Sequence, residues 1–388
     1  MRPRDALFSF AEQMFASSFN FFALVVAARM LVPDALSIYT AFFSLNQSFS
    51  FFLMGLILFP LASSSSADIE QQLSTSVVLL CFLLIGFTLL APLAMSMFDS
   101  FVGRIDFINW AVAAVFFASQ CIFETMRWLS IRLRGARVTL PVTVTRFVLF
   151  FGGLFLLKLE HFSGIVFALA QVAINLMAAL GYGLGLKLLR KIKLHMPDRN
   201  AVRQLAIFGN SFGSFITNFT AVTLIDRVWG GAGLLAFQAM KSATNPIGII
   251  SQLIDNHFSA STAKNDQKVK YGAHHILIAL VITGFLVTLS IPIAPWAIRF
   301  ALGENFIQWW PLFPSMLLAS LAHTITRPIF VNWRLCGDIW ALNFYTKSLI
   351  FIITPIMILF YVIEMPQLFV LVFAMQSLTC FFPLILKR

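Results

Sequence analysis

The sequence predicts an all-α polytopic membrane protein with about twelve transmembrane helices in two pseudo-symmetric six-helix lobes. Composition supports the membrane class, because 59% of the 388 residues are hydrophobic and 11% are charged, whereas soluble domains carry about 25% charged residues. The lengths of the apolar stretches suit the thickness of a bilayer, which supports the transmembrane helices. A repeat between the two halves of the sequence supports the two lobes. These observations exclude a soluble enzyme or a soluble nucleic-acid-binding domain as the main body of the chain.

Twelve apolar stretches are each long enough to cross roughly 30 Å of hydrocarbon as a helix. They are continuous apolar runs, which favours helices over barrel strands, whose side chains alternate over about ten residues. The connecting loops are mostly short and leave no room for a soluble catalytic domain. The expected spans are residues 6–30, 36–60, 74–97, 107–131, 139–158, 164–188, 205–226, 232–258, 274–298, 309–332, 339–362 and 366–386.

An internal repeat divides the chain. The repeat makes each half a unit of six spans. A six-span unit that occurs twice in one chain is typical of secondary transporters, whose substrate site lies between the two halves. We therefore predict an N-terminal lobe over 1–188, a basic cytoplasmic linker over 189–204 and a C-terminal lobe over 205–388. Asn20 and Arg29 recur 198 residues later as Asn218 and Arg227, and Arg127 and Arg134 recur 200 residues later as Arg327 and Arg334.

The basic residues predict the orientation. Alternate loops carry 19 of the 27 Lys and Arg residues on one side and five on the other, and the positive-inside rule places the richer side in the cytoplasm. Both termini are therefore expected in the cytoplasm. The formal net charge of +11 follows from the same rule and suits anionic membrane lipids as neighbours, so no nucleic-acid partner is expected.

Cysteine and histidine positions indicate neither a disulfide framework nor a metal site. Cys81, Cys121 and Cys380 fall within expected spans and Cys336 in a loop, with no CxxC or Cys/His spacing. We expect no bound cofactor. Coupling to a proton or sodium gradient is the energy source compatible with such a chain.

Three basic side chains, Arg146, Lys241 and Lys347, fall deep inside expected spans. A charge at the middle of a membrane helix costs roughly 2.5–3.5 kcal/mol on insertion scales, so such residues usually face a wet cavity or a partner. Arg146 and Lys347 occupy equivalent spans, and we expect them to face each other across the pseudo-twofold axis. With few deep acids to oppose them, the three cations predict a positive cavity that binds an anionic substrate such as a diphosphate.

Other placements of these cations remain open. The long side chains of Arg146 and Lys347 also permit snorkelling toward the cytoplasmic face. Arg29 and Arg227 end spans one and seven on the predicted outer side. Each is a candidate for substrate binding, for capping helix carbonyls or for binding lipid headgroups.

Acidic residues are scarce inside the spans. Glu12 lies in the first turns of span one, Glu124 in span four and Asp255 near the cytoplasmic end of span eight. Each is a candidate for carrying a coupling proton or ion. Glu124 precedes Arg127 by three residues, so the two share a helix face and are equally consistent with a structural ion pair.

Asn20 and Asn218 lie in the first span of each half. Their equivalent positions predict a polar lining at the interface between the halves, where they would contact substrate. The alternative is ordinary interhelical hydrogen bonding, which is worth about 0.6 kcal/mol for each bond.

The segment from Glu12 to Ala62 resembles the opening of polysaccharide flippases in the multidrug/oligosaccharidyl-lipid/polysaccharide (MOP) superfamily. In that family the first span ends in Ala-Arg-x-Leu, and a Gly-Pro turn and Gly-x-Tyr follow; here Val32 and Ser37 replace the two glycines. Ala301 to His323 resembles the junction between the ninth and tenth spans. The matching residues are Ala28, Arg29, Leu31, Pro33 and Tyr39 in the first segment and Gly303, Glu304 and Phe306 in the second.

The resemblance implies a MATE-like, V-shaped molecule whose lobes meet at a central cavity. It also implies that the chain flips a polyisoprenyl diphosphate-linked oligosaccharide, such as an O-antigen precursor of lipopolysaccharide, from the cytoplasmic to the outer leaflet of a bacterial inner membrane. The implied partners are this anionic lipid-linked glycan, membrane lipids, and a polysaccharide polymerase or glycosyltransferases.

Three other functions compete with a flippase. A cation-coupled multidrug exporter of the same superfamily needs deep acids, which are few here. A major-facilitator carrier also has two six-span lobes, but its Gly- and Arg-rich loop between spans two and three is replaced by Ser63 to Asp68. A membrane glycosyltransferase or polymerase needs large loops or clustered acids for a metal and a sugar nucleotide, so we do not expect an enzyme.

Overall fold

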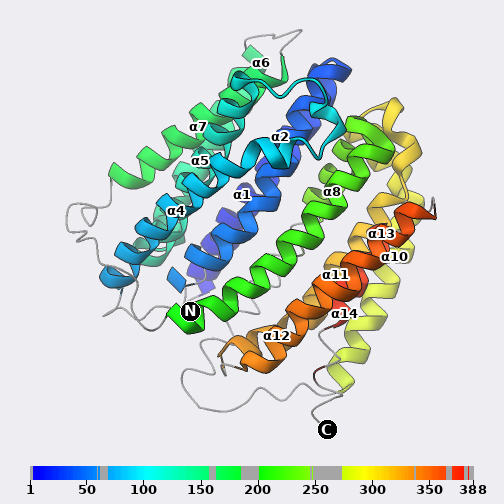
Figure 1. The fold of residues 1–388 in the computed structure, drawn as a ribbon. Helices are drawn as coiled ribbons and strands as arrows, with labels where there is room; N and C mark the ends of the chain where they lie inside the picture. The colour runs from blue at the N-terminus through cyan, green and yellow to red at the C-terminus, as the bar shows by residue number, and fades with distance from the viewer. Residues whose placement is uncertain are drawn as a thin grey trace.

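The computed structural model describes residues 3–58, 60–61, 69–156, 163–184, 201–244, 247, 273–335, 338–363, 369–379 and 383. Within these ranges all regular secondary structure is helical (Figure 1). The predicted all-α class is therefore confirmed.

The N-terminal half reproduces the first six expected spans to within a few residues. A π-helical turn extends the second of these helices, and a short 3-10 helix follows the third. The elements are α1 (Pro3–Met30), α2 (Pro33–Leu53), η1 (Met54–Leu58), α4 (Ile69–Met95), η2 (Asp99–Phe101), α5 (Phe107–Arg134), α6 (Ala136–Leu156) and α7 (Gly164–Leu184).

The described residues of the C-terminal half place a helix in each of the other six expected spans, although parts of the eighth and twelfth spans lie outside the described residues. A π-helical turn divides the eleventh span into two helical pieces. The elements are α8 (Ala201–Ala243), α10 (Ala273–Ala301), η4 (Glu304–Trp309), α11 (Leu312–Leu335), α12 (Ile339–Ser348), η5 (Leu349–Ile353), α13 (Thr354–Val362) and α14 (Phe369–Leu378).

The long element α8 contains two helical arms joined at Gly230. The backbone of Gly230 has φ 64° and ψ −175°, a left-handed region that glycine enters without steric cost. The chain reverses direction at Gly230. A hydrogen bond between the arms shows this reversal, because Lys241 Nζ in the second arm donates to Asn218 Oδ1 in the first arm at 2.5 Å. The two arms, 201–229 and 231–243, correspond to the expected seventh and eighth spans.

Eight described segments are long and apolar enough to cross a membrane, judged by length and composition. A further apolar helical segment, Leu312–Thr326, is shorter. The chain is therefore a multi-pass membrane protein. The placement of both termini in the cytoplasm and of the chain in a bacterial inner membrane stays a prediction.

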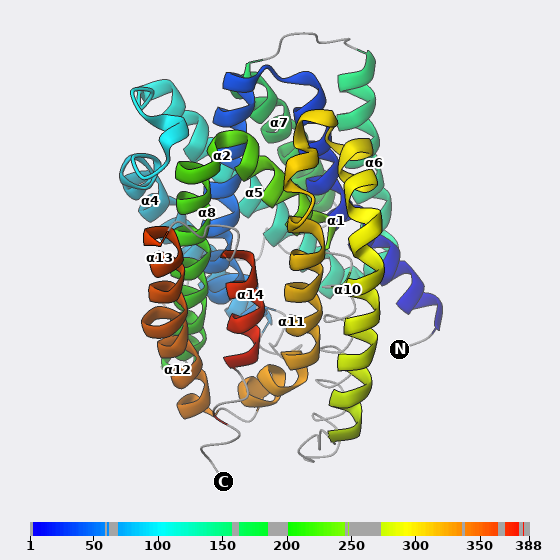
Figure 2. The same cartoon turned by 90° about the vertical axis from the view of Figure 1, so that its right-hand side faces the viewer.

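The helices pack in two groups that follow the sequence repeat. In the first half α1 packs on α6, α5 on α7 and α4, and α7 on α2 and α6. In the second half α11 packs on α10 and α14, and α12 on α8. Contacts of α8 with α1 and α2 join the halves, and Figures 1 and 2 show these three helices running together through the bundle. The predicted lobe boundaries, with the linker 189–204, stay a prediction, because residues 185–200 lie outside the described residues.

Aromatic side chains fill the contact between α2 and the first arm of α8. The ring of Phe49 lies 4.8 Å from that of Phe215, and the ring of Phe52 lies 4.6 Å from the same residue. Phe49 also packs 4.8 Å from Phe87 on α4, so one buried phenylalanine touches both halves. Aromatic pairs of this kind add about 0.5–1.5 kcal/mol to their area burial, which makes this contact a main part of the interface.

The close approach of α7 to α2 generates a first prediction. A Cβ atom on Gly164 would overlap the backbone carbonyl oxygen of Ala35, which cannot move aside as a flexible side chain can. Gly164→Ala should therefore lower the free energy of unfolding in detergent by about 1–3 kcal/mol, measured by denaturant or thermal unfolding. Gly152→Ala is the matched control, since its Cβ meets nothing within 4 Å. Equal stability of the two variants would contradict the close approach.

Candidate functional site

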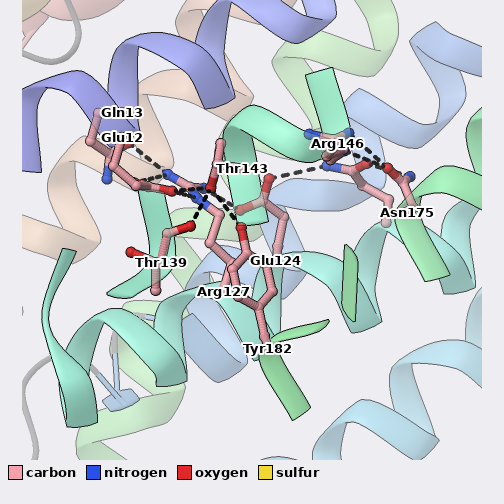
Figure 3. Close-up of polar contacts among 10 residues, drawn as sticks. Glu12, Gln13, Glu124, Arg127, Thr139, Thr143, Arg146, Asn175 and Tyr182 are labelled. Carbon is pink, nitrogen blue, oxygen red and sulfur yellow. Dashed lines mark hydrogen bonds and ion pairs between the residues drawn. The ribbon is translucent and has the colours of Figure 1, made fainter. Parts of the chain in front are cut away.

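A connected group of polar side chains lies inside the N-terminal half, among α1, α5, α6 and α7 (Figure 3). We call this group the N-lobe network. It joins hydrogen-bonding residues that are distant in sequence but that share the interior of one lobe. Its members are Glu12, Gln13, Gln120, Glu124, Arg127, Thr143, Arg146, Asn175 and Tyr182.

Arg127 is the centre of the N-lobe network. Its Nε donates to Glu12 Oε1 at 2.7 Å and its Nη1 to Glu124 Oε2 at 2.6 Å, while its Nη2 donates to Gln13 Oε1 at 2.8 Å. Glu12 is fully buried, and Arg127 is 4% exposed. The predicted pair of Glu124 and Arg127 is confirmed, and Glu12 joins it from another helix.

Glu12 also connects the network to two further helices. Its Oε1 accepts a hydrogen bond from Thr143 Oγ1 at 3.0 Å, and Thr143 Oγ1 lies 2.6 Å from the hydroxyl of Tyr182. The carboxylate of Glu12 thus has partners on α5 and α6, and Thr143 links it to Tyr182 on α7. A buried carboxylate needs such donors, because each missing partner in a low-dielectric interior is costly.

Arg146 occupies the other end of the same network. Its Nε and Nη2 donate to Asn175 Oδ1 at 3.0 and 2.7 Å, and its guanidinium carbon lies 3.5 Å from the ring centroid of Phe19 and 3.9 Å from that of Phe123. The side chain is therefore held between two aromatic faces, a favourable cation–π geometry. Only 3% of Arg146 is exposed.

Two amides connect Arg146 to the glutamates. Asn175 Nδ2 donates to Gln120 Oε1 at 3.1 Å, and Gln120 Nε2 donates to Glu124 Oε1 at 3.2 Å. The network thus contains two arginines and two glutamates, whose formal charges cancel. This cancellation explains how four ionisable groups lie inside a membrane lobe, since an unpaired charge there costs several kcal/mol.

A second polar cluster lies between the halves, along the contact of α2 with α8. Gln238 Nε2 donates to Ser44 Oγ at 2.9 Å, and Asn218 Nδ2 donates to Ser48 Oγ at 2.8 Å. Both bonds join a C-terminal side chain to an N-terminal one. We call Ser44, Ser48, Asn218, Gln238 and Lys241 the lobe seam.

Lys241 is the charged member of the lobe seam. Its Nζ donates to Asn218 Oδ1, and it lies 6.0 Å from the ring centroids of Phe51 on α2 and Phe373 on α14. The side chain is half-buried. Among the described residues it forms no ion pair with a carboxylate. Lys241 is thus a cation at the junction of the two halves whose charge is not balanced by a neighbouring acid in the described ranges.

The structure does not bring the three predicted cations together. Arg146 is enclosed by side chains of the N-terminal half, and Lys347 is exposed, so the expectation that these two face each other is wrong. The physical reason is that Glu12 and Glu124 neutralise the arginines of the N-lobe network. Snorkelling of Lys347 toward the cytoplasmic face stays a prediction.

Arg29 takes the capping role that the sequence left open, whereas Arg227 bonds to the turn after α4. Arg29 donates to the carbonyls of the last residues of α10, at 2.6 Å for Phe300, and Arg227 donates to the carbonyl of Met97 at 3.3 Å. Both side chains are exposed. Their predicted contact with substrate stays a prediction.

Three of the remaining five predicted residues lie in the two clusters. Asn218 is in the lobe seam, whereas Asn20 is half-buried on α1 and has no hydrogen bond to another described residue. Glu12 and Glu124 are in the N-lobe network, and their role in ion coupling stays a prediction. Asp255 lies outside the described residues.

The residues that the sequence analysis missed were spaced along helix faces. Gln120 precedes Glu124 by four residues, and Thr143 precedes Arg146 by three, so each pair lies on one side of its helix. Gln238 precedes Lys241 by three residues in the same way. Polar residues at spacings of three or four inside an apolar helix were the available signal for these clusters.

Comparison with known proteins identifies the architecture. No protein-family model and no curated protein matches the sequence. Solved structures do match over nearly the whole chain. A MOP superfamily transporter from Pyrococcus furiosus superposes with a TM-score of 0.57 at 14% identity, covering 98% of this chain and 93% of that one. The chain has the MATE transporter fold.

Two other solved structures agree. A MATE mutant gives a TM-score of 0.54 at 12% identity, with coverage of 98% of this chain and 93% of the other. An inward-facing multidrug resistance MATE transporter of the MOP superfamily gives 0.51 at 14% identity, with coverage of 97% and 93%. The predicted MATE-like, V-shaped arrangement of two six-helix lobes is thereby confirmed.

Charge cancellation in the N-lobe network generates a second prediction. Glu12→Gln leaves one carboxylate against two buried arginines and should lower the free energy of unfolding by about 3 kcal/mol. Adding Arg146→Gln restores equal numbers of both charges, so the double variant should lose less than the sum of the single losses, by about 0.5–3 kcal/mol. Unfolding curves of the four proteins in detergent measure this coupling. Strictly additive losses would show that the two ends of the network are independent.

Proposed function

We propose that this chain is a membrane transporter that moves its substrate between the two lobes by alternating access. The fold supports this proposal, because solved proteins that share it are named as transporters. The contact between the halves supports it as well. It is made by α1 and α2 on one side and by α8 on the other, so a relative movement of the lobes would open or close the lobe seam.

We propose further that the substrate is anionic and that Lys241 binds it. The observation that carries this proposal is the charge distribution: the buried glutamates are neutralised within the N-lobe network, whereas Lys241 at the lobe seam has an amide and two aromatic rings as neighbours. An ammonium group in a partly dehydrated site attracts phosphate more strongly than it would in water.

A polyisoprenyl diphosphate-linked oligosaccharide fits this site. The diphosphate would replace Asn218 as the partner of the ammonium group, the rings of Phe51 and Phe373 would pack against the glycan, and the polyisoprenyl chain would remain in the bilayer. The Pyrococcus furiosus transporter is described as having a binding pocket of reversed polarity that suggests a different function. Proteins of this fold are thus described with pockets of more than one polarity.

This proposal generates a third prediction. Lys241→Ala should reduce the initial rate of translocation by at least about ten-fold, because loss of one charged hydrogen bond is worth about 1.5–3 kcal/mol. The measurement uses proteoliposomes and a labelled polyisoprenyl diphosphate-linked oligosaccharide. Lys347→Ala removes the same charge from an exposed position and should keep the rate of the unmodified protein. An unchanged rate for Lys241→Ala would remove this residue from substrate binding.

A cation-coupled multidrug exporter is the second candidate function. The fully buried Glu12 favours it, because a carboxylate within a lobe is a suitable carrier of a coupling proton or ion. Solved transporters with this fold include one named for multidrug resistance.

A fourth prediction separates the two functions. If the chain exports cationic drugs, vesicles that contain it should show gradient-dependent efflux of a cationic dye. Glu12→Gln should then abolish that efflux, while Lys241→Ala should spare it, because a cationic dye has no attraction to an ammonium group. An anion carrier should show no such efflux and should respond to Lys241→Ala instead.

A further inference from the structure

Two contacts between the halves lie at one end of the bundle, where α1 and the first arm of α8 both end. We call this the clamp end; the distribution of basic residues predicts that it faces outward. Each contact is made by a side chain near the last turn of a helix in one half. One side chain reaches the last turn of α10 and the other reaches the turn after α4, so together they cross the interface in both directions.

The first contact joins α1 to α10. Arg29 Nη2 donates to the carbonyls of Arg299 at 3.2 Å and Phe300 at 2.6 Å, and its Nε donates to the carbonyl of Ala301 at 3.2 Å. These carbonyls belong to the last turn of α10, where the helix dipole favours a cation. Gly303, with φ 114°, ends the helix beside the guanidinium.

The second contact joins the first arm of α8 to the segment after α4. Arg227 Nε donates to the carbonyl of Met97 at 3.3 Å and lies 3.9 Å from a carboxylate oxygen of Asp99. The adjacent Asp226 accepts hydrogen bonds from the backbone N–H of Ser100 at 3.0 Å and from its hydroxyl at 2.7 Å. Asp226 is 1% exposed, so this contact has a buried part and an exposed part.

The two contacts occupy equivalent positions under the sequence repeat, although the groups that the two arginines meet differ. Arg29 and Arg227 are 198 residues apart, and Asp99 and Arg299 are 200 residues apart. Gly103 and Gly303, also 200 residues apart, both have a positive φ, of 71° and 114°. An arginine at the end of the first helix of each half therefore contacts the opposite half at equivalent places.

Other ion pairs at the clamp end stay within one half. Arg104 lies 3.6 Å from Asp34 in the N-terminal half, and Arg299 pairs with Glu304 in the C-terminal half. Neither of these pairs would change if the lobes separated. Arg29 and Arg227 differ from them because their partners belong to the opposite lobe.

We propose that Arg29 with its α10 carbonyls, and Asp226 with Arg227 and the segment 97–100, form a two-part latch that holds the clamp end closed. Separation of the lobes at this end breaks both parts at once, because each part spans the interface. The exposed arginine bonds can exchange with water, which makes the latch reversible. The inference uses the alternating movement of the proposed transporter and is independent of its substrate.

Spin-label distances across the clamp end test the latch. Val32, which is 47% exposed, and the exposed Asn305 lie in opposite halves near this end and take labels as Val32→Cys and Asn305→Cys. The background replaces the four native cysteines, with alanine at the buried Cys121. Double electron–electron resonance on the full chain in detergent, without substrate, gives the populations of closed and open lobes.

The double variant Arg29→Gln/Arg227→Gln should raise the population at long distances about ten-fold, since it removes both exposed bridges. Each single variant should give a smaller rise in the same direction. Arg104→Gln is the matched control, because it removes an arginine at the same end that pairs within one half; it should keep the distances of the unmodified protein.

An unchanged distribution in the double variant would overturn the latch, and so would an equal shift in the Arg104→Gln control. If the double variant does not fold, the two single variants decide by the same comparison. Failure of the Lys241 transport experiment would leave these distances unaffected. The two proposals can therefore fail separately.

Discussion

The structure depends on the neutralisation of charge inside the N-terminal lobe. A membrane helix that carries an arginine or a glutamate is costly unless a partner of opposite charge is in place, and Arg127 meets this requirement for Glu12 and Glu124 together. These bonds fix α1 against α5, while Thr143 and Asn175 extend the same constraint to α6 and α7. The lobe can therefore act as a unit when it moves against its partner.

The neutrality of the N-lobe network also affects the balance of charge at the lobe seam. Because the buried glutamates already have an arginine partner and Asp226 is bonded to Ser100, no described acid balances the ammonium group of Lys241. The contrast between a balanced lobe interior and a cation at the interface that no described acid balances is the basis for the proposal of an anionic cargo. A set of buried carboxylates without arginines would instead have favoured cationic cargo.

The sequence predicted the helices well and the side-chain clusters less well. Long apolar runs determine where the membrane helices lie, so the expected spans agree with the observed elements over the described residues. The repeat of Arg29 in Arg227 correctly indicated equivalent positions. The partners of Arg146 could not be predicted, because helix spacing alone does not tell which neighbouring helix faces a buried cation. From its deep position in the span, Arg146 was expected to carry a charge without an acidic partner. In the structure, Gln120 and Asn175 connect it to glutamates on other helices.

The tight reversal at Gly230 has a mechanical consequence. It joins the two arms of α8 in a hairpin, with the ammonium group of Lys241 on one arm and the carboxylate of Asp226 near the turn on the other. In the proposed transport cycle, a tilt of this hairpin on capture of an anion at Lys241 would displace Asp226 as well. The hairpin backbone would then couple the middle of the bundle to its end without a relay of side chains.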